Sequence, residues 1–118
     1  MEQSTGDLLC IEASDVVTHD WYSRFYLPAI EKILAHHDKI ALLFYYPNPK
    51  NFPGWEPKAA ELDFSKFDDF ATRIRKVALV NPPTIVSQRW DFRSQLLAGE
   101  FHEFEKDQLA EALAWIKS

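Results

Sequence analysis

The apolar residues of the chain fall into two patterns, short continuous runs and longer segments with helical spacing. Four runs have the length and composition of β-strands: residues 8–13, 40–46, 77–80 and 101–104. The run at 40–46 is apolar on both faces, which is typical of a central strand covered on both sides. The run at 101–104 mixes polar and apolar residues, so we expect it at an edge of the sheet.

Between the first two runs, apolar residues recur at steps of three and four, which places them on one face of a helix. Thr18 is the expected N-cap of this helix, because its hydroxyl can accept a hydrogen bond from the first turn. Pro28 lies inside the helix and should kink it, since proline lacks an N–H group and crowds the preceding turn. His36 and His37 suit the C-terminal end, where imidazoles complement the helix dipole.

A second helix should begin near Pro57, because proline is favoured in the first helical turn. Its predicted buried stripe follows steps of three and four and consists of Ala60, Phe64, Phe67, Ala71 and Ile74. The basic run at residues 73–76 then falls where this helix should end, a position that favours cations.

Two more helices complete the pattern. One lies between the proline pair at 82–83 and Gly99, which should end it by taking the positive φ of a helix C-terminus. The last begins after Lys106 with Asp107 as its N-cap. The residues expected in the core from these two helices are Trp90, Leu96, Leu97, Leu109, Ala112, Leu113 and Ile116.

Strand and helix alternate four times, and this order predicts an α/β fold. We expect a mainly parallel sheet of four to five strands, packed with about four helices and joined by right-handed crossovers. A length of 118 residues is that of one domain. Residues 1–118 are therefore interpreted as a single domain with a short tail at residues 1–6.

Charge and composition exclude several classes of partner. Eighteen acidic and 13 basic residues give a net charge of −5, and an acidic domain repels the phosphate backbone of nucleic acids. No apolar run approaches the ~20 residues of a membrane-spanning helix, and Cys10 is the single cysteine, which excludes an intrachain disulfide. We therefore expect a cytoplasmic protein that binds no nucleic acid and has no transmembrane segment.

Several short motifs follow one another along the chain. They are Ile11-Glu12, Leu27-Pro28-Ala29-Ile30, Phe52-Pro53-Gly54-Trp55, the run at 75–80 with Trp90 downstream, and the segment 111–116. In this order they resemble the SpoIIAA-like family, relatives of the STAS domains, over residues 8–117. The resemblance implies a superhelix of successive β–α turns, an architecture shared with the lipid-binding CRAL-TRIO domains. It also implies a non-catalytic regulatory or interaction module.

The sequence departs from that resemblance at two places. STAS relatives carry a phosphorylatable serine at the start of the second helix, whereas residues 54–58 contain no hydroxyl and Ser65 lies two turns later. We therefore do not expect a phosphorylation switch at this helix. The second departure is the turn at residues 81–83, Asn-Pro-Pro, where relatives more often have a Gly-Asp turn.

The candidate site is the carboxyl edge of the parallel strands, where ligands of open α/β sheets bind. The residues expected there, for a ligand or a partner, are Ser14, Asp15, Tyr46, Asn48, Lys50, Asn51, Trp55 and Asn81. An alternative interpretation of the long turn at 47–55 is a connection stiffened by prolines, with Phe52 and Trp55 packed against the second helix.

Three functions are compatible with these residues. The first is a non-enzymatic interaction or regulatory module, expected to be a homodimer that works with a protein partner. The second is a carrier of a lipid or other apolar small molecule, because four Trp residues exceed what a core rich in Phe needs. The third is a small hydrolase that uses His19 or the loop Ser14-Asp15, although no nucleophile motif is present. No spacing of histidines, cysteines and carboxylates suits a metal, and no cofactor is expected.

Overall fold

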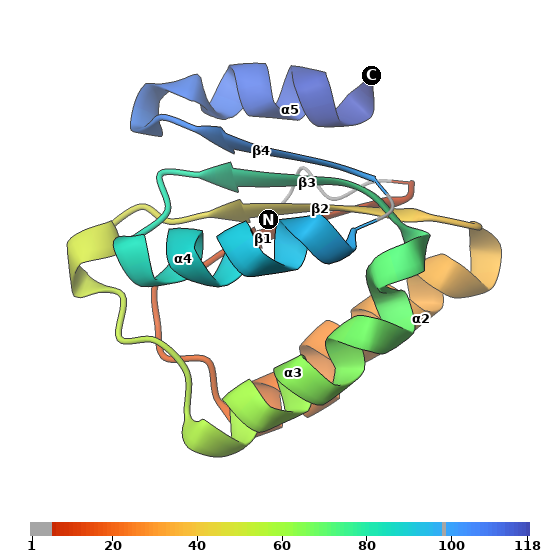
Figure 1. The fold of residues 1–118 in the computed structure, drawn as a ribbon, viewed down its shortest axis with the longest axis horizontal. Helices are drawn as coiled ribbons and strands as arrows, with labels where there is room; N and C mark the ends of the chain where they lie inside the picture. The colour runs from red at the N-terminus through yellow and green to blue at the C-terminus, as the bar shows by residue number, and fades with distance from the viewer. Residues whose placement is uncertain (1–5, 98) are drawn as a thin grey trace.

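The computed structural model of the protein describes residues 6–97 and 99–118, without the side chains of residues 68 and 96. At its centre lies a parallel sheet whose neighbouring strands are β1 (Leu8–Glu12), β2 (Ile40–Tyr45), β3 (Ile74–Val80) and β4 (Glu100–Phe104) (Figure 1). The predicted α/β fold with parallel strands is therefore confirmed, with β2 in the interior of the sheet and β4 at its edge. Apart from Gly6, the expected tail lies outside the described residues.

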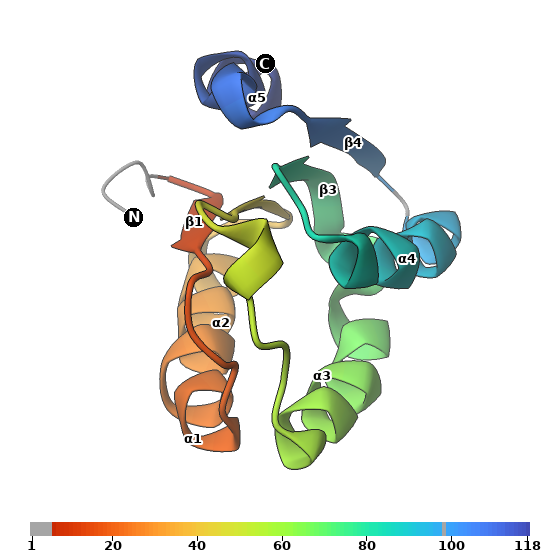
Figure 2. The same ribbon diagram turned by 90° about the vertical axis from the view of Figure 1, so that its left-hand side faces the viewer.

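Helices cover the two faces of the sheet unequally. One face packs against α1 (His19–Trp21), α2 (Leu27–His36), α3 (Pro57–Phe70) and α4 (Thr84–Arg93), whereas α5 (Leu109–Lys117) lies on the other face (Figures 1 and 2). Short 3₁₀ turns at Pro49–Asn51, Ala71–Arg73, Ser94–Leu96 and Lys106–Gln108 join these elements. In the described part of the chain, four helices therefore cover one face, and a single helix covers the other.

Alternation along the strands divides the core into two layers. In β2, Leu42 packs into the layer under α2, α3 and α4, and its neighbour Leu43 packs into the layer under α5. The α5 layer also contains Ala112 and Ile116, which are fully buried as predicted. Strands buried on both faces explain why 40–46 is a continuous apolar run.

The sequence predicts a kink of the first helix at Pro28; the structure has a π-helical turn, Tyr22–Tyr26, just before this residue, between α1 and α2. The helix begins as predicted, with Thr18 Oγ1 accepting a hydrogen bond from the Trp21 amide at 3.0 Å. In the wider turn the amide of Leu27 donates to the Tyr22 carbonyl, so the chain accommodates the proline one residue later. Tyr22 and Tyr26 are both turned into the core.

The predicted stripe of the second helix is right at Phe67 and Ala71, which are buried, and wrong in its first half. Ala59 is buried in place of Ala60, and Phe64 is 69% exposed. Ile74 is also misplaced, because α3 ends at Phe70 and Ile74 is the first residue of β3. The side of α3 that faces the core carries Ala59, Asp63 and Phe67. Asp63 is charged, so a search for apolar residues at helical spacing does not include it.

Two predicted helix boundaries are corrected as well. Gly99 has no positive φ; a Cβ atom there would lie 2.2 Å from the Arg75 carbonyl oxygen, so β4 can pair with β3 only because this residue has no side chain. Asp107 does not cap the last helix. Glu105 does so, because its side chain accepts from the amide of Gln108, whose own side chain accepts from the Glu105 amide at 2.7 Å. The predicted contact of Leu96 lies outside the described side chains.

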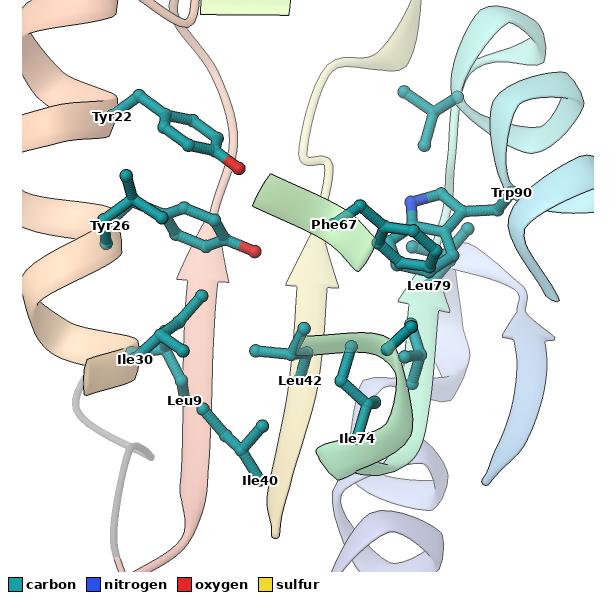
Figure 3. Packing of buried hydrophobic residues seen from close by; sticks show 14 of the residues in the cluster. Leu9, Tyr22, Tyr26, Ile30, Ile40, Leu42, Phe67, Ile74, Leu79 and Trp90 are labelled. Atoms are coloured by element: carbon teal, nitrogen blue, oxygen red, sulfur yellow. The ribbon is translucent and has the colours of Figure 1, made fainter. Parts of the chain in front are cut away.

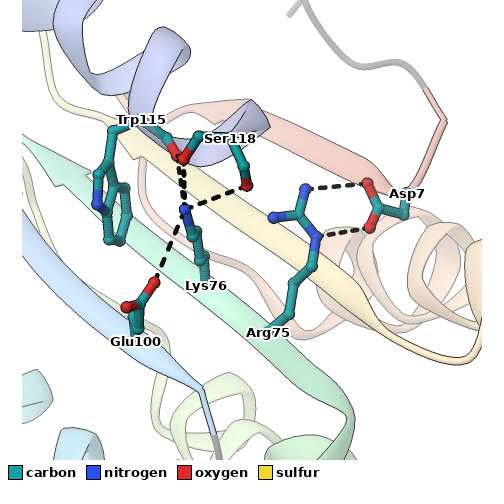
Figure 4. A network of polar contacts seen from close by, with 6 residues as sticks. All are labelled: Asp7, Arg75, Lys76, Glu100, Trp115 and Ser118. Carbon is teal, nitrogen blue, oxygen red and sulfur yellow. Dashed lines mark hydrogen bonds and ion pairs between the residues drawn. The ribbon is translucent and has the colours of Figure 1, made fainter.

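The basic run at 73–76 does not end its own helix but stabilises the ends of two others. Arg73 donates to the carbonyl oxygens of Leu34 and His37 at the C-terminus of α2, at 3.0 and 3.1 Å. Lys76 donates to the Trp115 carbonyl at the C-terminus of α5, at 2.8 Å (Figure 4). Cations at these positions satisfy carbonyl groups that have no partner inside the helix.

Arg75 holds the first strand instead, since its Nε and Nη2 atoms donate to the two carboxylate oxygens of Asp7 at 2.6 and 3.1 Å (Figure 4). This hydrogen bond lowers the pKa of Asp7 below its usual value. The pair therefore stabilises the folded chain above the unfolded pKa of ~4, and this contribution is lost as the pH falls through the lowered folded pKa.

We expect Asp7→Asn to lower the free energy of unfolding by about 1 kcal/mol at pH 7, because the bidentate ion pair is lost. The difference from the unsubstituted chain should vanish near pH ~2, where Asp7 is protonated in both states. Urea unfolding at several pH values measures this. Asp20→Asn is the control, since its pair with Arg24 is exposed, and a difference as large as that of Asp7→Asn would contradict the prediction.

Candidate functional site

A cavity of about 230 Å³ lies between the sheet and the helices of the larger layer. It is lined from four sides: the segment after β1, the strand β2, the π-helical turn, and the facing sides of α3 and α4. An apolar cavity of about 150 Å³ accommodates benzene. In proportion, this cavity has room for a ligand of roughly nine or ten non-hydrogen atoms.

The sheet side of the cavity is apolar. Ile40, Leu42 and Phe44 project from β2, and Ile74 projects from β3. Figure 3 shows the rings of Tyr22 and Tyr26 extending from one side of this face and those of Phe67 and Trp90 from the other. Aromatic walls of this kind are typical of small-molecule sites.

The helical side of the cavity contains a cluster of charged and polar groups around Asp63 of α3. Tyr22 donates a hydrogen bond to Asp63 Oδ1, and Arg89 Nη2 donates to Oδ2 at 2.8 Å. Arg93 Nη2 also lies 2.8 Å from Oδ2. The Asp63 and Arg93 side chains are only 13% and 7% exposed, so this ion pair is shielded from solvent.

Aromatic rings hold the two guanidinium groups in place. The Arg89 guanidinium lies 4.5 Å from the centre of the Trp55 ring, and that of Arg93 lies 4.7 Å from the centre of the Phe67 ring. Such cation–π contacts are strongest where water is excluded. Both arginines are therefore positioned by Asp63 and by neighbouring rings.

The polar cluster has more hydrogen-bond donors than acceptors. Arg89 Nε and Arg93 Nη2 are buried and donate to none of the residues that the structure describes; for Arg93 the approach to Asp63 is close but its angle is poor for a hydrogen bond. Burial raises the pKa values of Tyr22, Tyr26 and Tyr46 well above their usual range. These phenols therefore remain protonated donors at neutral pH.

Two loops form the rim of the cavity at the carboxyl edge of the strands. Val17, between β1 and α1, pairs with the segment before α3: its amide donates to the Gly54 carbonyl at 2.9 Å, and its carbonyl accepts from the Glu56 amide at 2.9 Å. The lining residues Glu12, Ser14, Asp15 and Val16 are exposed. They mark where the cavity opens to solvent.

The predicted site residues divide into two groups. Ser14, Asp15, Tyr46 and Trp55 all line the cavity, so the expected strand edge does contribute to its wall. The other four, which do not line it, are Asn48, Lys50, Asn51 and Asn81.

Asn81 stabilises the carboxyl ends of the strands. It takes a positive φ of 58°, its side chain donates to the Tyr46 carbonyl at 2.9 Å and its amide donates to the Phe104 carbonyl at 2.9 Å. It thereby connects the ends of three strands. In the long turn, Phe52 contacts the rings of Tyr46 and Trp55 edge-on at 5.3 and 5.5 Å, and its packing against the second helix stays a prediction.

Sequence reasoning missed Asp63, Arg89, Arg93 and the two tyrosines of the π-helical turn as site residues. The helical spacing of Arg93 could have indicated it, since Arg93 follows the buried Val86 by seven residues and therefore lies on the same side of α4. Asp63 lies on the inward side of α3 in the same way. Charged residues at buried helical positions indicate either an internal ion pair or a ligand.

The groups considered for other chemistry do not converge with the cluster. His19 lies at the exposed start of α1, where its backbone amide donates to Glu56 Oε1 at 2.9 Å. Within residues 6–97 and 99–118, no three His, Cys, Asp or Glu side chains are placed to share a metal ion. Nor does the described part of the chain contain a helix long and apolar enough to cross a membrane.

Comparison with known proteins places this geometry in a family. A family model described as SpoIIAA-like matches residues 8–117. A crystal structure of an uncharacterized protein from the DUF3478 family with a SpoIIAA-like fold, from Shewanella loihica PV-4, is similar with a TM-score of 0.66 and 22% identity. The similarity covers 89% of this chain and 80% of that one. None of the curated proteins compared with the chain matches it.

Removal of the shared carboxylate should destabilise the protein. We expect Asp63→Ala to lower the free energy of unfolding by about 3 kcal/mol, because two shielded guanidinium groups lose their counterion. Asp69→Ala, on the exposed side of the same helix, should cost under ~0.5 kcal/mol. Urea denaturation of both variants tests this, and equal losses would contradict the assigned burial of the cluster.

Proposed function

This chain belongs to the SpoIIAA-like family, and we propose that it functions by binding a small, largely apolar molecule in the cavity between β2, α3 and α4, without catalysing a reaction. The observation on which this depends is a cavity of about 230 Å³ that opens into the larger of the two core layers. Partly open pockets with aromatic and apolar walls and a few polar groups are the usual sites of small ligands. A retained cavity therefore favours a ligand.

The composition of the wall supports an apolar ligand. Trp21, Trp55 and Trp90 all border the cavity, which gives three of the four tryptophans a use beyond filling the core. Their rings, together with those of Tyr26 and Phe44, offer large apolar contact areas that are held rigidly. An apolar ligand would gain most of its binding free energy from these surfaces.

A non-catalytic role agrees with how the reactive groups are engaged. The carboxylate of Asp63 already accepts a hydrogen bond from Tyr22 and is paired with Arg89 and Arg93. Burial raises the pKa values of the phenols of Tyr22 and Tyr26, so they stay protonated at neutral pH and cannot act as general bases. Proton transfer by these groups would first require breaking the cluster.

A regulatory or interaction role is the second candidate, and it is compatible with ligand binding. Large apolar side chains are exposed on the helical side of the molecule, namely Phe25, Phe64, Ile85 and Phe92. Such side chains favour a protein partner or a second copy of the chain. The expected homodimer stays a prediction that the mass in solution would test.

A substitution that fills the cavity should weaken ligand binding while it leaves the free energy of unfolding almost unchanged. We expect Leu42→Phe to place a larger ring in the cavity, leave the free energy of unfolding within ~1 kcal/mol, and weaken ligand binding at least tenfold. Leu43→Phe, the same change at a fully buried position under α5, should cost about 1–3 kcal/mol through overpacking. Urea unfolding compares the two, and equal destabilisation would argue against the cavity.

The binding itself is tested by titration calorimetry with 1-octanol, a probe with nine non-hydrogen atoms. We expect saturable binding at one site and a negative heat-capacity change, the mark of buried apolar surface. Octanoate and octylamine, of similar size, are titrated in parallel. If none of the three binds, or if Leu42→Phe binds them as well as the unsubstituted chain, the proposed function is wrong.

A further inference from the structure

Resting on this proposed function, we propose that the ligand is an apolar monocarboxylic acid of about ten non-hydrogen atoms, with its carboxylate bound by Arg89 and Arg93 and its tail against β2. The cavity has a polar helical side and an apolar sheet side, so an occupant that complements both is amphipathic. The surplus of donors on the helical side indicates which polar group it has.

The donor count requires acceptors that the described residues do not provide. Two guanidinium groups present ten N–H donors, whereas Asp63 supplies a single carboxylate that also accepts from Tyr22. Arg89 Nε and Arg93 Nη2 are buried without a hydrogen bond to any described residue. Tyr26, whose side chain is buried as a whole, lines the same cavity. A ligand oxyanion would accept from several of these groups.

The charge balance of the inner wall points the same way. Arg89 and Arg93 contribute two positive charges and Asp63 one negative charge, which leaves one positive charge uncompensated in a site whose Arg93 side chain is 7% exposed. An uncompensated buried charge is costly. A carboxylate suits planar guanidinium groups because it accepts two parallel hydrogen bonds.

The mouth of the cavity limits the ligand to a single charge. Glu12 and Asp15 stand at the exposed rim, where their charges are screened by solvent and salt but still oppose an incoming anion. Their repulsion grows with the number of negative charges on the ligand, so a phosphate monoester is disfavoured relative to a monocarboxylate. The apolar sheet side then selects a hydrocarbon or aromatic tail.

The test compares three probes that share a chain length and differ in the head group: octanoate, 1-octanol and octylamine. At neutral pH we expect octanoate to bind at least roughly tenfold more tightly than 1-octanol, as expected for a hydrogen bond to a charged group, and octylamine to bind most weakly. Binding of 1-octanol or octylamine as tight as that of octanoate would overturn the inference while leaving the proposed function intact. Absence of all binding overturns both.

Variants locate the head group. We expect Arg93→Met to weaken octanoate binding at least tenfold and to change 1-octanol binding by less than threefold, whereas Arg24→Met, on an exposed pair, should change neither. If Arg93→Met does not fold, Asp63→Asn is the second test. It removes the negative charge that competes with the carboxylate of the ligand for Arg89 and Arg93. It should raise the preference for octanoate over 1-octanol, and an unchanged or smaller preference would overturn the assignment.

Discussion

The larger core layer depends on one interaction, the shared carboxylate of Asp63. It draws together the π-helical turn, α3 and α4 by accepting from Tyr22 and pairing with Arg89 and Arg93. Apolar packing alone could bring these three segments over the sheet, but it would not fix their spacing. An ion pair inside the layer has directional requirements, and it keeps the segments far enough apart for a cavity to remain.

The core layers on the two faces of the sheet therefore differ in the size of their side chains. Under α5, small and medium side chains such as Ala112, Ala78 and Leu43 are fully buried. At one end of the helix the Glu105 amide donates to the Gln108 side chain, and at the other Lys76 donates to the Trp115 carbonyl. Under α3 and α4, large rings meet around a void. The candidate site therefore lies in the layer that contains the large rings.

The sequence predicted the strands and their order well, and the site less well, for reasons that particular residues make clear. Residues 40–46 are apolar on both faces because the strand is covered on both, so their pattern is unambiguous. In α3 the large apolar side chain of Phe64 predicts burial, yet it is exposed and Ala59 occupies the core. Asp63 and Arg93 were missed because hydropathy treats charges as solvent-facing, and their pairing crosses 30 positions of sequence that no local pattern connects.

The π-helical turn at Tyr22–Tyr26 has a consequence for how this segment is aligned between homologues. Such a turn contains one residue more than an α-helical turn, so side chains before and after it are offset by about 100° around the axis. A homologue with an uninterrupted α-helix would need a single-residue gap within 22–26. Without that gap, Tyr22 would be compared with a position that faces another direction, and the conservation of the group that contacts the shared carboxylate would go unnoticed.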